Sequence, residues 1–65
     1  MENNFRVILA KQCKRVSDVY RATGISRNTL TNLYYERAKN LELKTLLKIT
    51  DYLGVILDEL LKSEN

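Results

Sequence analysis

The chain has 65 residues, a net charge of +3 at neutral pH, one cysteine and no histidine or proline. This length allows one domain, predicted over residues 1–65, with a modest core that association with a second copy would stabilise. Because Cys13 is alone and histidine is absent, an intrachain disulfide and the usual metal clusters are excluded, and we expect no metal and no cofactor. The apolar runs, such as Val-Ile-Leu at 7–9, are too short to cross a bilayer, and the N-terminal segment lacks the features of a signal peptide. The sequence therefore predicts a soluble, cytoplasmic protein with no membrane partner and no evident small-molecule ligand.

The charges are distributed unevenly along the chain. Residues 5–48 carry ten Lys or Arg against three Asp or Glu, whereas residues 49–65 carry one Lys against four acidic residues. A basic body with an acidic end is typical of proteins that bind a polyanion on one side. On charge alone, an unevenly charged solvated surface is the simpler interpretation.

Five short helices are predicted, because apolar residues recur at helical spacing and strand signals are poor. Each apolar stripe is expected to face the core, with Cys13 as a small core residue. In chain order the stripes are Phe5, Ile8, Leu9 and Cys13; Val16, Val19 and Tyr20; Leu30, Leu33 and Tyr34; Leu43, Leu46, Leu47, Thr50 and Leu53; and Leu57, Leu60 and Leu61.

Glycine and serine residues predict several helix ends. Ser17 is expected to cap the second helix. Gly24 and Gly54 stand where the second and fourth helices should stop, because the residue after a helix often needs positive φ. Ile25 then fills the turn and Ser26 caps the third helix, which makes a helix-turn-helix. The end of the third helix is not predicted.

One face of the third helix is polar and free of acidic residues. Arginine pairs bidentately with guanine in the major groove, asparagine pairs with adenine, and a threonine methyl can contact the thymine methyl. An ordinary solvated face would explain this segment alone, but its combination with the glycine turn and basic surroundings favours DNA reading. On a helical wheel the face spans about 140° and contains Arg27, Asn28, Thr31, Asn32 and Tyr35.

The chain resembles the phage-repressor-like Cro/Xre helix-turn-helix family from about Phe5 to Leu61. The segment ATGISRNTLTNL is similar to the family's turn and recognition helix, and LKTLLKITDYLGVILDELL is similar to its fourth and fifth helices. The resemblance implies an all-α, compact five-helix bundle of the lambda-repressor type that binds operator DNA, commonly as a dimer.

The resemblance also implies roles for particular residues. Base contacts are expected from Arg27, Asn28, Thr31 and Asn32. Phosphate contacts are expected from Arg15, Ser17, Ser26, Tyr35, Arg37, Lys39, Asn40 and Lys44. Apart from the resemblance, Ile56 has no clear place on the core face of a monomer, so an apolar dimer patch of Tyr52, Val55 and Ile56 is expected, with packing in the core as the alternative for Tyr52.

Four positions depart from the family's pattern. Val16 stands where the second helix usually begins with a phosphate-binding glutamine, and Tyr20 stands where an alanine usually packs between the two helices. Glu36 replaces the glycine that follows the recognition helix, and Ile56 replaces a serine that often caps the fifth helix. Tyr20 implies looser helix packing or a ring lying over the edge of the core.

The sequence predicts a prokaryotic or phage transcriptional regulator, with a repressor favoured, that reads double-stranded DNA through its third helix. An enzyme is not expected, because no nucleophile is paired with a base and no glycine-rich phosphate loop is present. The alternative is a protein-interaction module on the same fold, such as an antitoxin, an antirepressor or an assembly partner. The substitutions at Val16 and Glu36 leave this alternative open.

Overall fold

The structure, a computed structural model, describes residues 2–62. The helices are α1 (Phe5–Lys11), α2 (Val16–Thr23), α3 (Arg27–Tyr34), α4 (Leu43–Leu53) and α5 (Leu57–Leu61). No strand occurs within the described range, so the predicted all-α, five-helix architecture is confirmed. The outermost ends of the predicted 1–65 domain, residue 1 and residues 63–65, lie outside the described residues.

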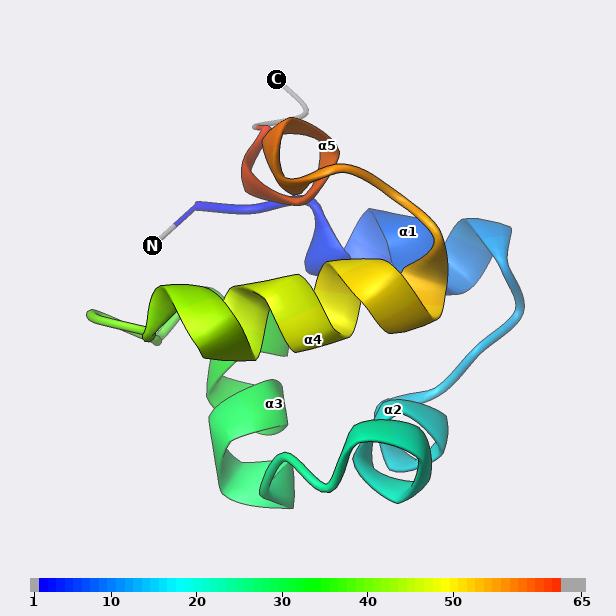
Figure 1. The fold of residues 1–65 in the computed structure, drawn as a ribbon, viewed down its shortest axis with the longest axis horizontal. Coiled ribbons are helices and arrows are strands. Elements are labelled where there is room, and N and C mark those ends of the chain that lie inside the picture. Colours follow the sequence, from blue (N-terminus) through cyan, green and yellow to red (C-terminus); the bar gives the residue numbers. More distant parts are fainter. Residues whose placement is uncertain (1, 63–65) are drawn as a thin grey trace.

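Helix α4 runs across the molecule and separates two pairs of helices (Figure 1). On one side, α2 and α3 pack against each other, and α2 also packs against α4. On the other side, α5 packs against both α4 and α1, and α1 reaches α3. The helix-turn-helix is therefore supported by α4, which contacts α2, and by α1, which contacts α3.

A single apolar cluster fills the space between the helices, and every helix contributes to it. Val16, Ile25, Tyr34 and Val55 pack partly buried against this cluster, so Ile25 fills the turn as predicted. The buried members are Phe5, Ile8, Leu9, Val19, Leu30, Leu33, Leu46, Ile49, Leu53 and Leu60.

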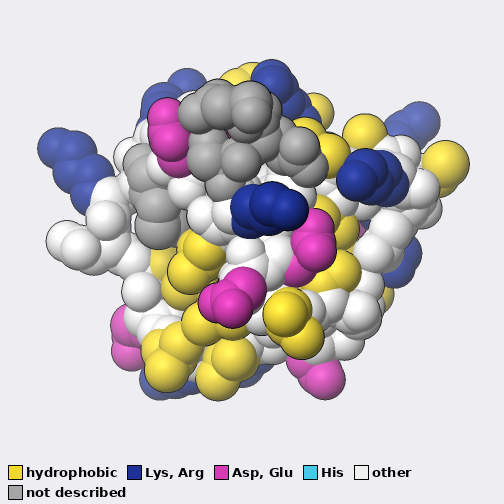
Figure 2. Space-filling view, turned by 90° about the horizontal axis from the view of Figure 1, so that it is seen from above, with side chains coloured by type: hydrophobic (Ala, Val, Ile, Leu, Met, Phe, Trp, Pro, Cys, Tyr) yellow, Lys and Arg dark blue, Asp and Glu magenta, His cyan; other side chains and the backbone are white. Residues whose placement is uncertain are grey.

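Fewer leucine side chains of α4 are buried in the core than the sequence predicts. Leu43 and Leu47 were expected to be buried, but they are 59% and 47% exposed, whereas Ile49 is fully buried. The leucine-rich helix offers two overlapping stripes, and packing against α2 and α5 buries the stripe that contains Ile49. Leu61 is also exposed, and Figure 2 shows hydrophobic side chains among acidic and basic ones on the α5 side.

The predicted glycine and serine signals at the turns are confirmed. Gly24 and Gly54 follow α2 and α4 with φ of 76° and 70°, in the left-handed region. Ser26 is the N-cap of α3, and its Oγ accepts a hydrogen bond from the Thr29 N–H at 3.1 Å.

Two predictions near the start of α2 were wrong. The N-cap of α2 is Arg15 and not Ser17, because the Asp18 carboxylate reaches back to accept the Arg15 N–H at 2.8 Å. Cys13 is exposed and has a φ of 55°, so it is not a core residue. It occupies the left-handed position that ends α1, where its N–H donates to the Ala10 carbonyl at 3.2 Å.

The segment before α1 holds the ends of two distant helices. The Asn3 side chain donates to the Leu33 carbonyl at the end of α3, at 3.0 Å. The Asn4 N–H donates to the Leu60 carbonyl in α5, at 2.7 Å. These two bonds join the beginning of the chain to the recognition helix and to the last helix.

Glu36 ends the third helix, whose boundary the sequence left open. The α-helix stops at Tyr34, and Glu36 takes a φ of 60°, a region that costs side-chain-bearing residues free energy. Its N–H donates to the Leu33 carbonyl at 3.1 Å, while the Arg37 N–H returns to the Asn32 carbonyl at 2.7 Å. Glu36 thus adopts the conformation that glycine would adopt without strain.

Replacing Glu36 by glycine should therefore raise the free energy of unfolding by about 1 kcal/mol, because the left-handed backbone would no longer carry a Cβ. Chemical denaturation of both proteins measures this difference. The Glu36→Ala variant is the control, since it removes the same carboxylate but keeps the Cβ. An equal gain in both variants would attribute the effect to charge and contradict the backbone explanation.

Candidate nucleic-acid interface

The buried side of α3 fixes which residues it presents to solvent. Leu30 and Leu33 are fully buried, and the Ser26 cap fixes the first turn of the helix. Arg27 and Asn28 are consequently exposed at the N-terminal end of α3. The other two predicted base-contacting residues, Thr31 and Asn32, are half-buried one turn further along the same helix.

Arg27 is held by a contact that the sequence analysis missed. Its guanidinium carbon lies 4.8 Å from the centroid of the Tyr20 ring, which belongs to α2 and is 37% exposed. Tyr20 lies over the rim of the helix pair, in agreement with one of the two predicted placements. Charge and periodicity carried no signal for this pairing, because it depends on how α2 crosses α3.

Three basic residues surround a hollow of about 380 Å³ beside the start of α2. Arg6 from α1 and both Lys14 and Arg15 from the following loop line it, together with Val16 and Tyr35. No ion pair engages these three cations within residues 2–62. The Lys14 Nζ donates to Gln12 Oε1 at 2.9 Å, so in the described part of the chain Arg6 and Arg15 are the cations left without a charged or amide partner beside the apolar lining, an arrangement that suits a phosphate group.

The sequence analysis singled out neither Arg6 nor Lys14 as a site residue. The signal that was available is spacing, because Arg6 and Ala10 lie four residues apart and share a face of α1. Lys14 follows at the same interval, just beyond the end of that helix. The hollow also shows that cationic residues lie next to Val16 at the start of α2, although Val16 itself is apolar.

A second hollow, of about 390 Å³, borders α3 at Thr29 and Asn32. It is lined by Arg37, Lys39 and Asn40 from the loop after α3, and also by Asn32. The guanidinium of Arg37 lies 5.2 Å from the centroid of the Tyr35 ring. The structure thus brings three of the predicted phosphate-contacting residues beside a predicted base-contacting residue.

Lys44 is separated from this group. It lines a different hollow along α4, with Leu47 and Lys48, and its Nζ lies 3.9 Å from a carboxylate oxygen of Glu42. Of the predicted phosphate contacts, Arg15 and Tyr35 lie at one hollow and Arg37, Lys39 and Asn40 at the other, with Lys44 apart from both.

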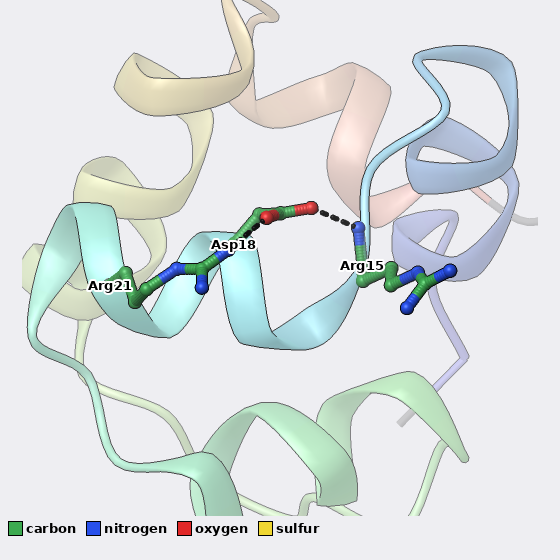
Figure 3. Close-up of polar contacts among 3 residues, drawn as sticks. All are labelled: Arg15, Asp18 and Arg21. Carbon is green, nitrogen blue, oxygen red and sulfur yellow. Dashed lines mark hydrogen bonds and ion pairs between the residues drawn. The ribbon is translucent and has the colours of Figure 1, made fainter.

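Asp18 is the acidic residue closest in sequence to the basic start of α2, and it is neutralised locally (Figure 3). Its carboxylate accepts the Arg15 N–H at 2.8 Å and pairs with the Arg21 guanidinium at 2.7 Å. The bond from the Arg15 N–H, followed by the Arg21 contact, lowers the pKa of Asp18 below its ordinary value. Ser17, predicted to contact phosphate, is half-buried beside it.

The lowered pKa of Asp18 predicts a pH dependence of stability. Because the carboxylate is favoured in the folded state, its contribution is complete above the ordinary pKa of 3.8 and disappears as the pH falls through the lower, folded-state pKa. Asp18→Asn should therefore lower the thermal midpoint at neutral pH, and the difference from wild type should shrink in acid. Asp51→Asn, at an exposed position of α4, is the control. A difference that persisted unchanged in acid would contradict this assignment.

The predicted dimer patch is only partly brought together. Val55 and Ile56 line a hollow of about 280 Å³ with Ile8, Lys11 and Glu59, among others. Ile56 is 70% exposed at its rim. Tyr52 lies elsewhere: it packs partly buried against the core, with the Lys14 Nζ 4.5 Å from its ring centroid.

Within residues 2–62, no three Cys, His, Asp or Glu side chains are grouped so that they could hold a metal ion. None of the helices in this range has the length and apolar character needed to cross a membrane.

Comparison with known families agrees with the geometry. A family model described as a Cro/C1-type HTH DNA-binding domain matches residues 4–65, a range that contains all five helices. The resemblance predicted from the sequence is thereby confirmed. A comparison with curated proteins gave no match.

Proposed function

Because the chain belongs to the Cro/C1-type helix-turn-helix DNA-binding family, and so binds DNA, we propose that it is a transcriptional repressor that reads a short operator with α3 in the major groove. The observation that carries this proposal is the exposed, acid-free N-terminal end of α3, with two hollows lined by cationic residues further along the helix, one at Thr31 and Tyr35 and the other at Asn32. A reading helix needs base-contacting groups at the end that enters the groove, and phosphate-binding groups on both sides of it.

Each residue of the interface has a proposed partner on the DNA. Arg27 would pair with a guanine and Asn28 with an adenine, while Thr31 and Asn32 would contact bases further along the groove. The phosphates would be bound by two groups, one on each side of α3. The first group is Arg15, Ser17 and Tyr35, joined by Arg6 and Lys14; the second is Ser26, Arg37, Lys39 and Asn40.

The first group supplies what the missing glutamine would otherwise supply. Val16 cannot bind a phosphate through its side chain, but it lines the hollow that Arg6, Lys14 and Arg15 surround. Cationic side chains there would give a stronger and more salt-dependent attraction than one amide. Lys44, in its separate hollow, would contact phosphate only at the edge of this surface.

We further propose that the protein acts as a homodimer through the hollow that Ile56 borders. Lys11 and Glu59 line the same hollow with opposite charges. In a two-fold symmetric interface the same patch of each copy is in contact, so Lys11 of each copy could pair with Glu59 of the other. The exposed Ile56 side chain supplies apolar surface between them.

Ile56→Lys should make the protein monomeric, because it adds a second positive charge beside Lys11 to the proposed apolar contact between the two copies. Sedimentation equilibrium measures the change. Affinity for a palindromic site should fall by about tenfold or more, while affinity for one half-site should stay the same. Leu47→Lys, at an exposed apolar position outside this hollow, is the control, and equal loss of association in both variants would contradict the assignment.

Selection from a random-sequence duplex pool tests the proposed function directly. The expected product is a short palindrome whose half-sites are centred roughly 34 Å apart, with log affinity falling steeply as log salt rises. A reporter whose promoter carries this palindrome should lose expression when the protein is produced, and increased expression would make the protein an activator. Weak, salt-insensitive binding without enrichment would contradict the proposal and point to a protein partner.

A further inference from the structure

The contact between Tyr20 and Arg27 joins two features that are otherwise unexplained. Tyr20 stands where a small residue usually separates the two helices, and its ring is neither buried nor fully exposed. Arg27 is the first residue of α3 and extends over that ring. Asp18 pairs with Arg21, and no ion pair to Arg27 occurs within residues 2–62.

We propose that Tyr20 is a positioning residue that sets sequence specificity: its ring supports the face of the Arg27 guanidinium so that the N–H edge is presented to a guanine. This inference rests on the proposed DNA reading by Arg27 and assigns Tyr20 a role in it. A cation over an aromatic ring is attracted through its face, and the five N–H donors of arginine lie in the guanidinium plane. Stacking on Tyr20 therefore leaves the donors available for the O6 and N7 atoms of guanine.

The energetic consequence is preorganisation. A free arginine side chain populates many rotamers, and binding a single base edge restricts it to one of them. When the ring holds Arg27 before DNA arrives, part of this restriction is already present in the free protein. The ring also disfavours alternative arginine rotamers that would bind a different base or a phosphate. Its main effect is therefore on discrimination between base pairs.

The Tyr20 hydroxyl has no part in this contact, because the ring face makes it. Tyr20→Phe should therefore retain the selectivity of the wild type. Tyr20→Leu removes the ring and should lower discrimination at one base pair, the one whose selection is lost in Arg27→Ala, by about three- to fivefold. Its affinity for non-specific DNA should stay unchanged.

Two controls separate positioning from folding and from phosphate binding. Tyr35→Leu is the matched substitution, because the Tyr35 ring also lies against a guanidinium, that of Arg37. Arg37 is a proposed phosphate contact, so this substitution should weaken binding to all DNA sequences alike. In an Arg27→Ala background, Tyr20→Leu should have no further effect on discrimination, because the supported side chain is gone.

NMR relaxation of the Arg27 Nε–H group in the DNA-free protein gives a readout that does not depend on binding. We expect a restricted side chain in the wild type and in Tyr20→Phe, and a mobile one in Tyr20→Leu. A restricted Arg27 in a protein that selects no sequence would refute the DNA-reading function while leaving the contact intact. Uniform loss of affinity in Tyr20→Leu, tighter specific binding in it, or equal loss in Tyr20→Phe would each overturn the positioning role.

Discussion

Replacing Arg27 by alanine should weaken binding to the selected operator by about 1–3 kcal/mol and remove the preference at one base pair of each half-site. The reason is geometric, since a bidentate contact to guanine is lost and no neighbouring residue of the first turn offers a second guanidinium. Competition binding against a set of operators with single base changes measures the loss. Non-specific affinity should fall only slightly.

The Lys39→Ala variant is the control for this experiment. Lys39 lies in the loop after α3 among the proposed phosphate contacts, so its removal should weaken binding to every sequence alike. It should also reduce the dependence of log affinity on log salt by about one. Uniform losses in both variants would show that Arg27 contacts the backbone and not a base.

Leu33→Ala should destabilise the domain by about 2–5 kcal/mol, because it leaves a cavity where a fully buried side chain stood. A domain of this size has a total stability of only about 3–10 kcal/mol. Leu33 also anchors the recognition helix, whose last turn carries the carbonyl that Asn3 binds. Unfolding in urea, followed by helical circular dichroism, measures the loss.

Leu47→Ala provides the comparison, since the same side chain is removed from an exposed site on α4. Its cost should be about 0.5 kcal/mol or less. The sequence placed both leucines on apolar stripes, so this pair tests the structural distinction directly. Similar losses in the two variants would mean that Leu47 is covered in solution.

The helix ends that were predicted correctly are those set by local chemistry. Gly24 and Gly54 take positive φ and Ser26 accepts a hydrogen bond within its own turn, so each signal lies within a few residues. The N-cap of α2 was misplaced because two residues, Arg15 and Ser17, could each occupy the position before the helix. Asp18 satisfies the Arg15 N–H from inside the helix, and Ser17 becomes a helical residue instead.

The features that could not be predicted depend on how helices are placed relative to each other. Periodicity gave α4 a wide leucine stripe, but only packing against its neighbours decides that Ile49 is enclosed and Leu43 is not. The same holds for the site. The base-contacting residues share one helix and could be proposed together, whereas the hollow around Arg6 requires α1, α2 and α3 in place.

The bonds from Asn3 and Asn4 to the ends of α3 and α5 have a consequence for synthesis on the ribosome. Asn4 finds its hydrogen-bond partner, the Leu60 carbonyl, only after α5 has been translated. Local helices such as α2 and α3 can form earlier, but the core that aligns them lacks Leu60 until then. The nascent protein should therefore acquire its DNA-reading surface in one late step, after α5 has left the exit tunnel.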